Sequence, residues 1–70
     1  MKRRALLKHL RRFGCVLLRE GRSHTLYVNP QTGHYEAVPR HPEVDDDLAR
    51  KICKELSVPV VGRPEQDDDD

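Results

Sequence analysis

The chain contains no tryptophan, a single phenylalanine and only two cysteines among its 70 residues. Cys15 and Cys53 are not spaced as a CxxC pair, and each lies in an apolar pattern, which favours buried reduced thiols over a disulfide or a zinc site. The four histidines stand at scattered positions rather than in a ligand cluster. We therefore expect no metal and no other cofactor.

Long hydrophobic runs are missing as well. No apolar stretch approaches the roughly 20 residues that a membrane-spanning helix needs, and Lys8 and His9 interrupt Ala5-Leu6-Leu7 before a secretory signal could form. The expected location is the cytoplasm, with no membrane contact. A chain this short makes one small domain that buries only about 60% of its unfolded surface.

The net charge of +1 conceals an uneven distribution. Residues 1–42 carry nine Lys and Arg against two acids, whereas residues 43–70 carry four against ten. We expect a basic domain over residues 1–60 and a disordered acidic tail over residues 61–70. A basic body indicates nucleic acid or another polyanion as partner, although a merely solvated helix face is an equally good reading of charge alone.

Hydrophobic spacing predicts two helices. Residues 3–13 place Leu6, Leu10 and Phe13 on one stripe, and Gly14 is suited to end that helix. A second helix is predicted to begin at residues 45–47, where aspartates can accept hydrogen bonds from free N–H groups, and to end at Val58-Pro59.

Three short strands are predicted between the helices, over residues 15–19, 23–28 and 34–38. Gly21-Arg22 supplies the first turn and residues 29–33 the second, while the third strand is expected at a sheet edge. The order is α-β-β-β-α. We predict an α+β fold like that of a double-stranded-RNA-binding domain, with a three-stranded antiparallel sheet and both helices on one face.

The stretch from Gly21 to Val28 carries the side chains best suited to take part in a reaction. His24 stands at the start of a predicted strand, and imidazole exchanges protons readily near neutral pH because its unperturbed pKa is about 6.5. Alternation places His24, Leu26 and Val28 on one face and Thr25 and Tyr27 on the other. The sequence leaves open which face meets the helices.

Several segments together resemble one known family. Residues 2–15 resemble the first helix and glycine stop of the HicA-type (YcfA-like) bacterial toxins, and residues 21–27, Gly-Arg-Ser-His-Thr-Leu-Tyr, resemble their Gly-x-Ser-His-x-x-aromatic signature. Residues 38–41, 43–44 and 48–52 resemble the closing segments of that family. The resemblance covers roughly residues 2 to 59, with its parts in the right order.

The resemblance implies a small mRNA interferase, the endoribonuclease of a type II toxin–antitoxin pair, which a HicB-type antitoxin protein neutralises. The recognised catalytic histidine of the family corresponds to His24. Such an enzyme arrests growth and translation by cutting mRNA.

The residues themselves fit that chemistry. A neutral His24 imidazole can accept the proton of an RNA 2′-hydroxyl while cations stabilise charge on the phosphate, and no metal is required for this step. Lys8, Arg22 and Ser23 are the expected RNA-binding residues, and His41 is the one other histidine considered for a second proton transfer. Two alternatives stay open: a non-catalytic RNA-binding module of the same fold, and an inactive protein that only docks a partner.

Overall fold

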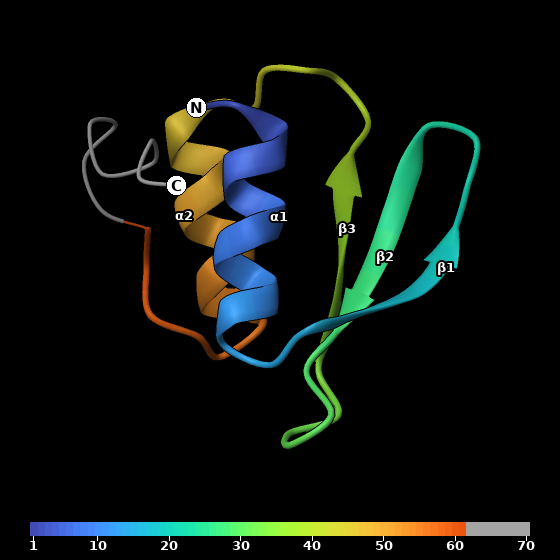
Figure 1. Ribbon diagram of the computed structural model, residues 1–70, viewed down its shortest axis with the longest axis vertical. Coiled ribbons are helices and arrows are strands. Elements are labelled where there is room, and N and C mark those ends of the chain that lie inside the picture. Colours follow the sequence, from blue (N-terminus) through green and yellow to red (C-terminus); the bar gives the residue numbers. More distant parts are fainter. Residues whose placement is uncertain (62–70) are drawn as a thin grey trace.

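The computed structural model describes residues 1–61 and confirms the predicted order of elements (Figure 1). Helix and strand bounds lie within a few residues of the predicted ones: α1 (Arg3–Arg12), β1 (Val16–Glu20), β2 (His24–Val28), β3 (Tyr35–Pro39) and α2 (Asp46–Glu55). Residues 62–70, which make up all but the first residue of the predicted acidic tail, lie outside the described part. Val61 itself is buried against the core.

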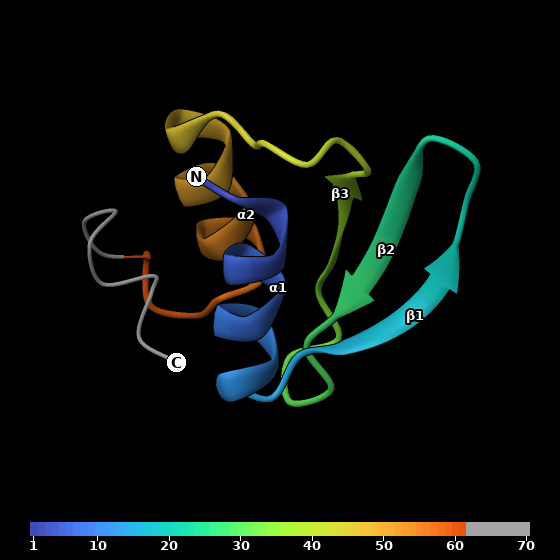
Figure 2. The ribbon, with the colours of Figure 1, turned by 45° about the horizontal axis from the view of Figure 1, so that its top comes forward.

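The three strands form one antiparallel sheet in the order β1-β2-β3. Both helices lie on the same side of this sheet, as two views show (Figures 1 and 2). Residues 24–28 of β2 pair with residues 39–35 of β3, so that His24 is opposite Pro39 and Val28 is opposite Tyr35. The third strand is an edge strand, as predicted.

Burial identifies the face of the sheet that the helices cover. Thr25 and Tyr27 are 1% and 5% exposed, so this face of β2 points toward the helices and His24 points the other way. The core that fills the space between the sheet and the helices is almost entirely aliphatic: Leu6, Leu7, Leu10, Cys15, Tyr27, Val38, Val44, Ala49, Ile52, Cys53, Leu56, Val58 and Val61.

The end of α1 differs from the prediction. Phe13, predicted as part of the apolar stripe, is 42% exposed because the helix ends at Arg12 and Gly14 follows with φ +90. Its ring packs against His9, with ring centroids 4.9 Å apart. His9 is half-buried, and its Nε2 lies 2.7 Å from the Pro59 carbonyl oxygen.

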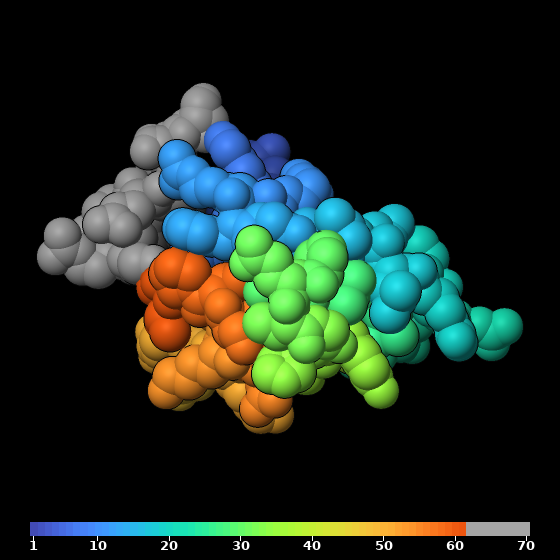
Figure 3. Space-filling model, turned by 90° about the horizontal axis from the view of Figure 1, so that it is seen from below, coloured from blue at the N-terminus to red at the C-terminus, as the bar shows by residue number. Residues whose placement is uncertain are grey.

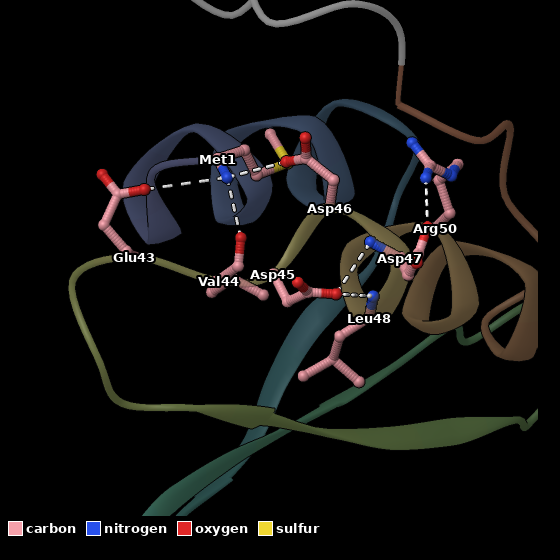
Figure 4. A network of polar contacts seen from close by, with 8 residues as sticks. All are labelled: Met1, Glu43, Val44, Asp45, Asp46, Asp47, Leu48 and Arg50. Carbon is pink, nitrogen blue, oxygen red and sulfur yellow. Dashed lines mark hydrogen bonds and ion pairs between the residues drawn. The ribbon is translucent and has the colours of Figure 1, made fainter.

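The start of α2 confirms the predicted aspartate cap. The Asp45 carboxylate accepts hydrogen bonds from the backbone N–H groups of Asp47 and Leu48, at 3.1 and 3.3 Å (Figure 4). The Met1 α-ammonium donates to the Val44 carbonyl at 2.7 Å and to Asp46 at 2.9 Å. The hydrogen bond and the charge of the Met1 α-ammonium lower the pKa of the Asp46 carboxyl. The two contacts of this ammonium group join the beginning of α1 to the beginning of α2.

The β1–β2 hairpin extends beyond the layer of helices. A view from below shows it projecting past the rest of the molecule (Figure 3). Val16, Leu17 and Leu18 of β1 are each about half exposed, and a bulge interrupts the register between Leu17 and Arg19. The exposed strand β1 therefore depends on its pairing with β2 and on contacts at its ends. Neither described helix is long and apolar enough to cross a membrane.

Candidate active site

The three-residue loop between β1 and β2, Gly21-Arg22-Ser23, presents His24. The Gly21 N–H donates to the His24 carbonyl oxygen at 2.8 Å, which closes the hairpin. A Cβ atom on Gly21 would lie 2.8 Å from that same oxygen, so a larger residue would force the turn to shift. Glycine is needed here for close approach. Arg22, Ser23 and His24 follow in sequence, and all three are exposed.

A first arginine ties this turn to the end of β3. The Arg40 N–H donates to the Ser23 carbonyl at 3.2 Å, and the Arg40 guanidinium donates to the Gly21 carbonyl at 3.2 Å. The same guanidinium forms an ion pair with Glu20, with 2.6 Å between Nη1 and Oε1. Arg40 thus holds both sides of the loop that carries His24.

A second arginine reaches the same end of the sheet from α1. Arg3 donates through Nε to the Pro39 carbonyl at 2.8 Å and through Nη2 to the Thr25 hydroxyl at 2.9 Å. The Thr25 hydroxyl in turn donates to Glu20 at 3.2 Å. Pro39 is paired with His24 and Thr25 follows it, so Arg3 contacts the immediate backbone neighbours of the imidazole-bearing residue.

The His24 imidazole differs from two other histidines. His9 Nε2 lies 2.7 Å from a carbonyl oxygen, and His34 Nδ1 lies 3.1 Å from the Ser57 hydroxyl. Within residues 1–61, the His24 ring makes no hydrogen bond or ion pair. Both ring nitrogens are therefore accessible to a ligand. His41 is also exposed and lies two residues beyond Pro39, at the same end of the sheet.

The predicted RNA-binding residues separate into two groups. Arg22 and Ser23 lie in the loop directly before His24. Lys8 is on the exposed side of α1, five residues beyond Arg3, which corresponds to about 7.5 Å along a helix axis. Arg3 of the same helix, rather than Lys8, contacts the neighbours of His24.

Arg3, Glu20 and Arg40 were not among the predicted site residues. The contacts of Arg3 with Pro39 and Thr25, and of Arg40 with Glu20, join positions 20 to 36 residues apart, so no local spacing could reveal them. The one available signal was the register, because pairing His24 with Pro39 places Arg40 beside the loop. The described residues contain no group of three or more His, Cys, Asp or Glu side chains arranged to hold a metal ion.

Comparison with known protein families gives one match. Residues 3–58 match the family described as HicA toxin of bacterial toxin–antitoxin systems, a span that contains all five helices and strands. No curated protein and no solved structure matches the chain.

Proposed function

Since the chain belongs to the HicA toxin family of bacterial toxin–antitoxin systems, we propose that it acts as an mRNA interferase, an endoribonuclease with His24 as its catalytic residue. The observation that carries this proposal is the state of the His24 side chain. It is an exposed imidazole that has no hydrogen-bond or ion-pair partner among residues 1–61, and it directly follows a loop that Gly21 and Arg40 hold in place. A proton-transfer group needs both properties, because it must reach the substrate in a fixed geometry.

RNA supplies the nucleophile for the reaction. The neutral imidazole of His24 takes the proton from a ribose 2′-hydroxyl, and the 2′-oxygen then attacks the adjacent phosphorus as the bond to the 5′-oxygen breaks. The products are a 2′,3′-cyclic phosphate and a 5′-hydroxyl, to which a protonated imidazole can return the proton. A positioned acid or base contributes about 10²- to 10⁴-fold to such a step.

Cations and donors near His24 bind the phosphate in this proposal. Arg22 and Ser23 are adjacent to it in the loop, and Lys8 contacts RNA farther along α1. Stabilising the charge that develops on the phosphate oxygens is the part of catalysis that such fixed donors supply. Arg40 serves as a positioning residue, because it is bound to the loop through Ser23 and Gly21.

The biological setting follows from the family. As a toxin, the chain has an antitoxin partner, and we propose that this partner is a HicB-type protein in a type II pair. We also propose that the toxin acts in the cytoplasm on mRNA, where cleavage stops translation and growth.

The test compares purified His24→Ala with a matched control, His34→Ala, which removes another exposed imidazole. We expect His24→Ala to lose cleavage of a transcript and growth arrest in cells while it still binds RNA, and His34→Ala to keep all three. Cleavage that persists in His24→Ala would overturn the proposal. An intact wild-type fold that binds RNA without cutting it would instead identify the non-catalytic RNA-binding module.

A further inference from the structure

An open pocket of about 460 Å³ lies beside the candidate active site, where the start of α1 meets the segment after β3. Its lining is dominated by positive charge: Lys2, Arg3, Arg4, Arg40, Pro42 and Glu43. Backbone hydrogen bonds join the start of α1 to the segment after β3: the Arg3 N–H donates to the Pro42 carbonyl at 2.8 Å, and Lys2 forms a β-bridge with Glu43. The cations therefore have a fixed backbone beneath them.

The positive charge of this pocket is only partly compensated within the described residues. Arg40 is paired with Glu20, and the Glu43 carboxylate lies 3.7 Å from the Met1 α-ammonium. Lys2, Arg3 and Arg4 form no ion pair with any residue of the described part. Three cations around one concave surface repel one another, and an anion placed among them relieves that repulsion.

Arg3 is the most informative of the three. Its side chain is half-buried, and neutral oxygen atoms of Pro39 and Thr25 fix its guanidinium at 2.8 and 2.9 Å. A guanidinium held by neutral acceptors keeps its full charge and has lost its rotational freedom before any ligand arrives. Such a group is prepared to bind a phosphate through its remaining N–H donors.

From these observations we infer that the pocket lined by Lys2, Arg3 and Arg4 is a binding subsite for an RNA backbone phosphate. This inference rests on the proposed function and deepens it, because it assigns to the substrate strand a second point of contact. None of the residues predicted from the sequence to bind RNA lies in this pocket.

The phosphate in the subsite is not the one that is cleaved. Thr25, which Arg3 contacts, faces the helices, whereas His24 projects from the opposite face of the sheet. A strand that reaches both groups must pass over the end of β2. The pocket thus holds the backbone of a neighbouring nucleotide and positions the scissile one at His24.

The decisive experiment measures RNA affinity in a background that cannot cleave. In His24→Ala protein, Lys2→Gln and Arg4→Gln are combined, since both side chains are exposed and their loss leaves the core untouched. The matched control combines Arg50→Gln with Lys51→Gln on α2, which removes the same charge from exposed positions outside the pocket. The dissociation constant of a single-stranded oligoribonucleotide is then measured over a series of salt concentrations.

The pocket variant is expected to bind several-fold more weakly than the control. Each lost phosphate contact on a single strand reduces the magnitude of the negative slope of log affinity against log salt by about 0.7, so the double variant should lose about 1.4 of that magnitude. Equal affinity and equal slope in the pocket variant and the control would overturn the inference. Adding Arg3→Gln, with thermal unfolding as the check on folding, should make the salt dependence shallower still.

A second measurement separates this inference from the proposed function. With His24 intact, the Lys2→Gln/Arg4→Gln variant should raise KM with little change in kcat, because a flanking phosphate contact is made equally in the ground state and the transition state. A fall in kcat with unchanged KM would contradict a flanking subsite. If the wild-type chain cleaves no RNA at all, the proposed function fails, and the affinity series still decides whether the pocket binds phosphate.

Discussion

The two ends of β2 are held by different means. At the Val28 end, Asn29 is 4% exposed, and its side-chain amide donates to the Leu56 carbonyl at 2.8 Å. Its Oδ1 also accepts from the Gln31 N–H at 3.0 Å. At the His24 end, the corresponding links are made by charged groups, with the exposed Glu20–Arg40 pair closing the loop.

This difference separates stability from function within one strand. Buried hydrogen bonds between neutral groups contribute strongly, because leaving either partner unsatisfied costs its full desolvation. Exposed ion pairs contribute little and are weakened by salt, but they keep charged groups and an imidazole in reach of a ligand. The Val28 end anchors the sheet to α2, and the His24 end presents chemistry to the solvent.

The largest effect on stability is expected at the anchored end. Asn29→Ala removes two hydrogen bonds and leaves the Leu56 carbonyl buried without its donor, which should lower the free energy of unfolding by about 2–3 kcal/mol. Chemical denaturation measures this change. Cleavage by the fraction that stays folded should be unaffected, and a variant as stable as the wild type would show that the two ends do not differ as described.

A pair of glycine substitutions compares the two turns directly. Gly21→Ala places a Cβ 2.8 Å from the His24 carbonyl, so the turn must shift, and a displacement of about 1 Å at a catalytic group can cost on the order of 10²-fold in rate. Gly33→Ala puts an alanine at φ +80 in open space, at a cost of about 1–2 kcal/mol in stability. We expect the first to reduce cleavage and the second only the melting temperature. Equal loss of activity in both variants would show that the Gly21 turn matters no more for cleavage than the Gly33 turn does.

Much of the fold follows from the sequence because it depends on local patterns. Gly14 and Gly33 have the positive φ values that their turn positions indicated, and Asp45 caps α2. Phe13 was placed wrongly because periodicity cannot show where a helix ends to within a residue.

The surroundings of His24 were less accessible to sequence reasoning. The loop residues Arg22 and Ser23 could be named from their position, but Arg3 and Arg40 arrive from α1 and from the end of β3. Their placement depends on the strand register, which the Gly21-Arg22 turn did not fix in advance. Alternation along β2 also does not show which of its faces the helices cover, whereas the burial of Thr25 and Tyr27 does.

Removing the charge of Glu20 tests the role of the ion pair at the His24 end of β2. Glu20→Gln breaks the ion pair with Arg40, and the free energy of unfolding should change by less than about 1 kcal/mol because the pair is exposed. Cleavage should fall several-fold, since the Arg40 guanidinium that donates to the Gly21 carbonyl loses the charged partner that orients it. Asp47→Asn, which breaks the exposed Arg50–Asp47 pair on α2, is the matched control and should leave cleavage unchanged.

The smallest effect concerns thiol reactivity near the anchored end. Burial raises the pKa of the Cys15 thiol, which precedes the β1 residue paired with Val28, and burial also raises the pKa of Cys53. Both thiols therefore stay protonated at pH 8 and should react slowly with iodoacetamide until the protein unfolds. Asn29→Ala should speed this reaction and Glu20→Gln should not. If Glu20→Gln sped the reaction and Asn29→Ala did not, the His24 end of β2 would be the end that stabilises the fold.

The chemistry of the cleaved ends shows most directly whether the His24 imidazole activates the 2′-hydroxyl. Purified protein is incubated with an oligoribonucleotide and with a copy that carries 2′-deoxyribose at the cleaved position, and the product termini are identified by mass. If the His24 imidazole activates the 2′-hydroxyl, the RNA yields a 2′,3′-cyclic phosphate and a 5′-hydroxyl, and the 2′-deoxy copy stays intact. Cleavage of the 2′-deoxy copy, or products ending in a 3′-hydroxyl and a 5′-phosphate, would show that the 2′-hydroxyl is not the nucleophile and that His24 does not act as proposed.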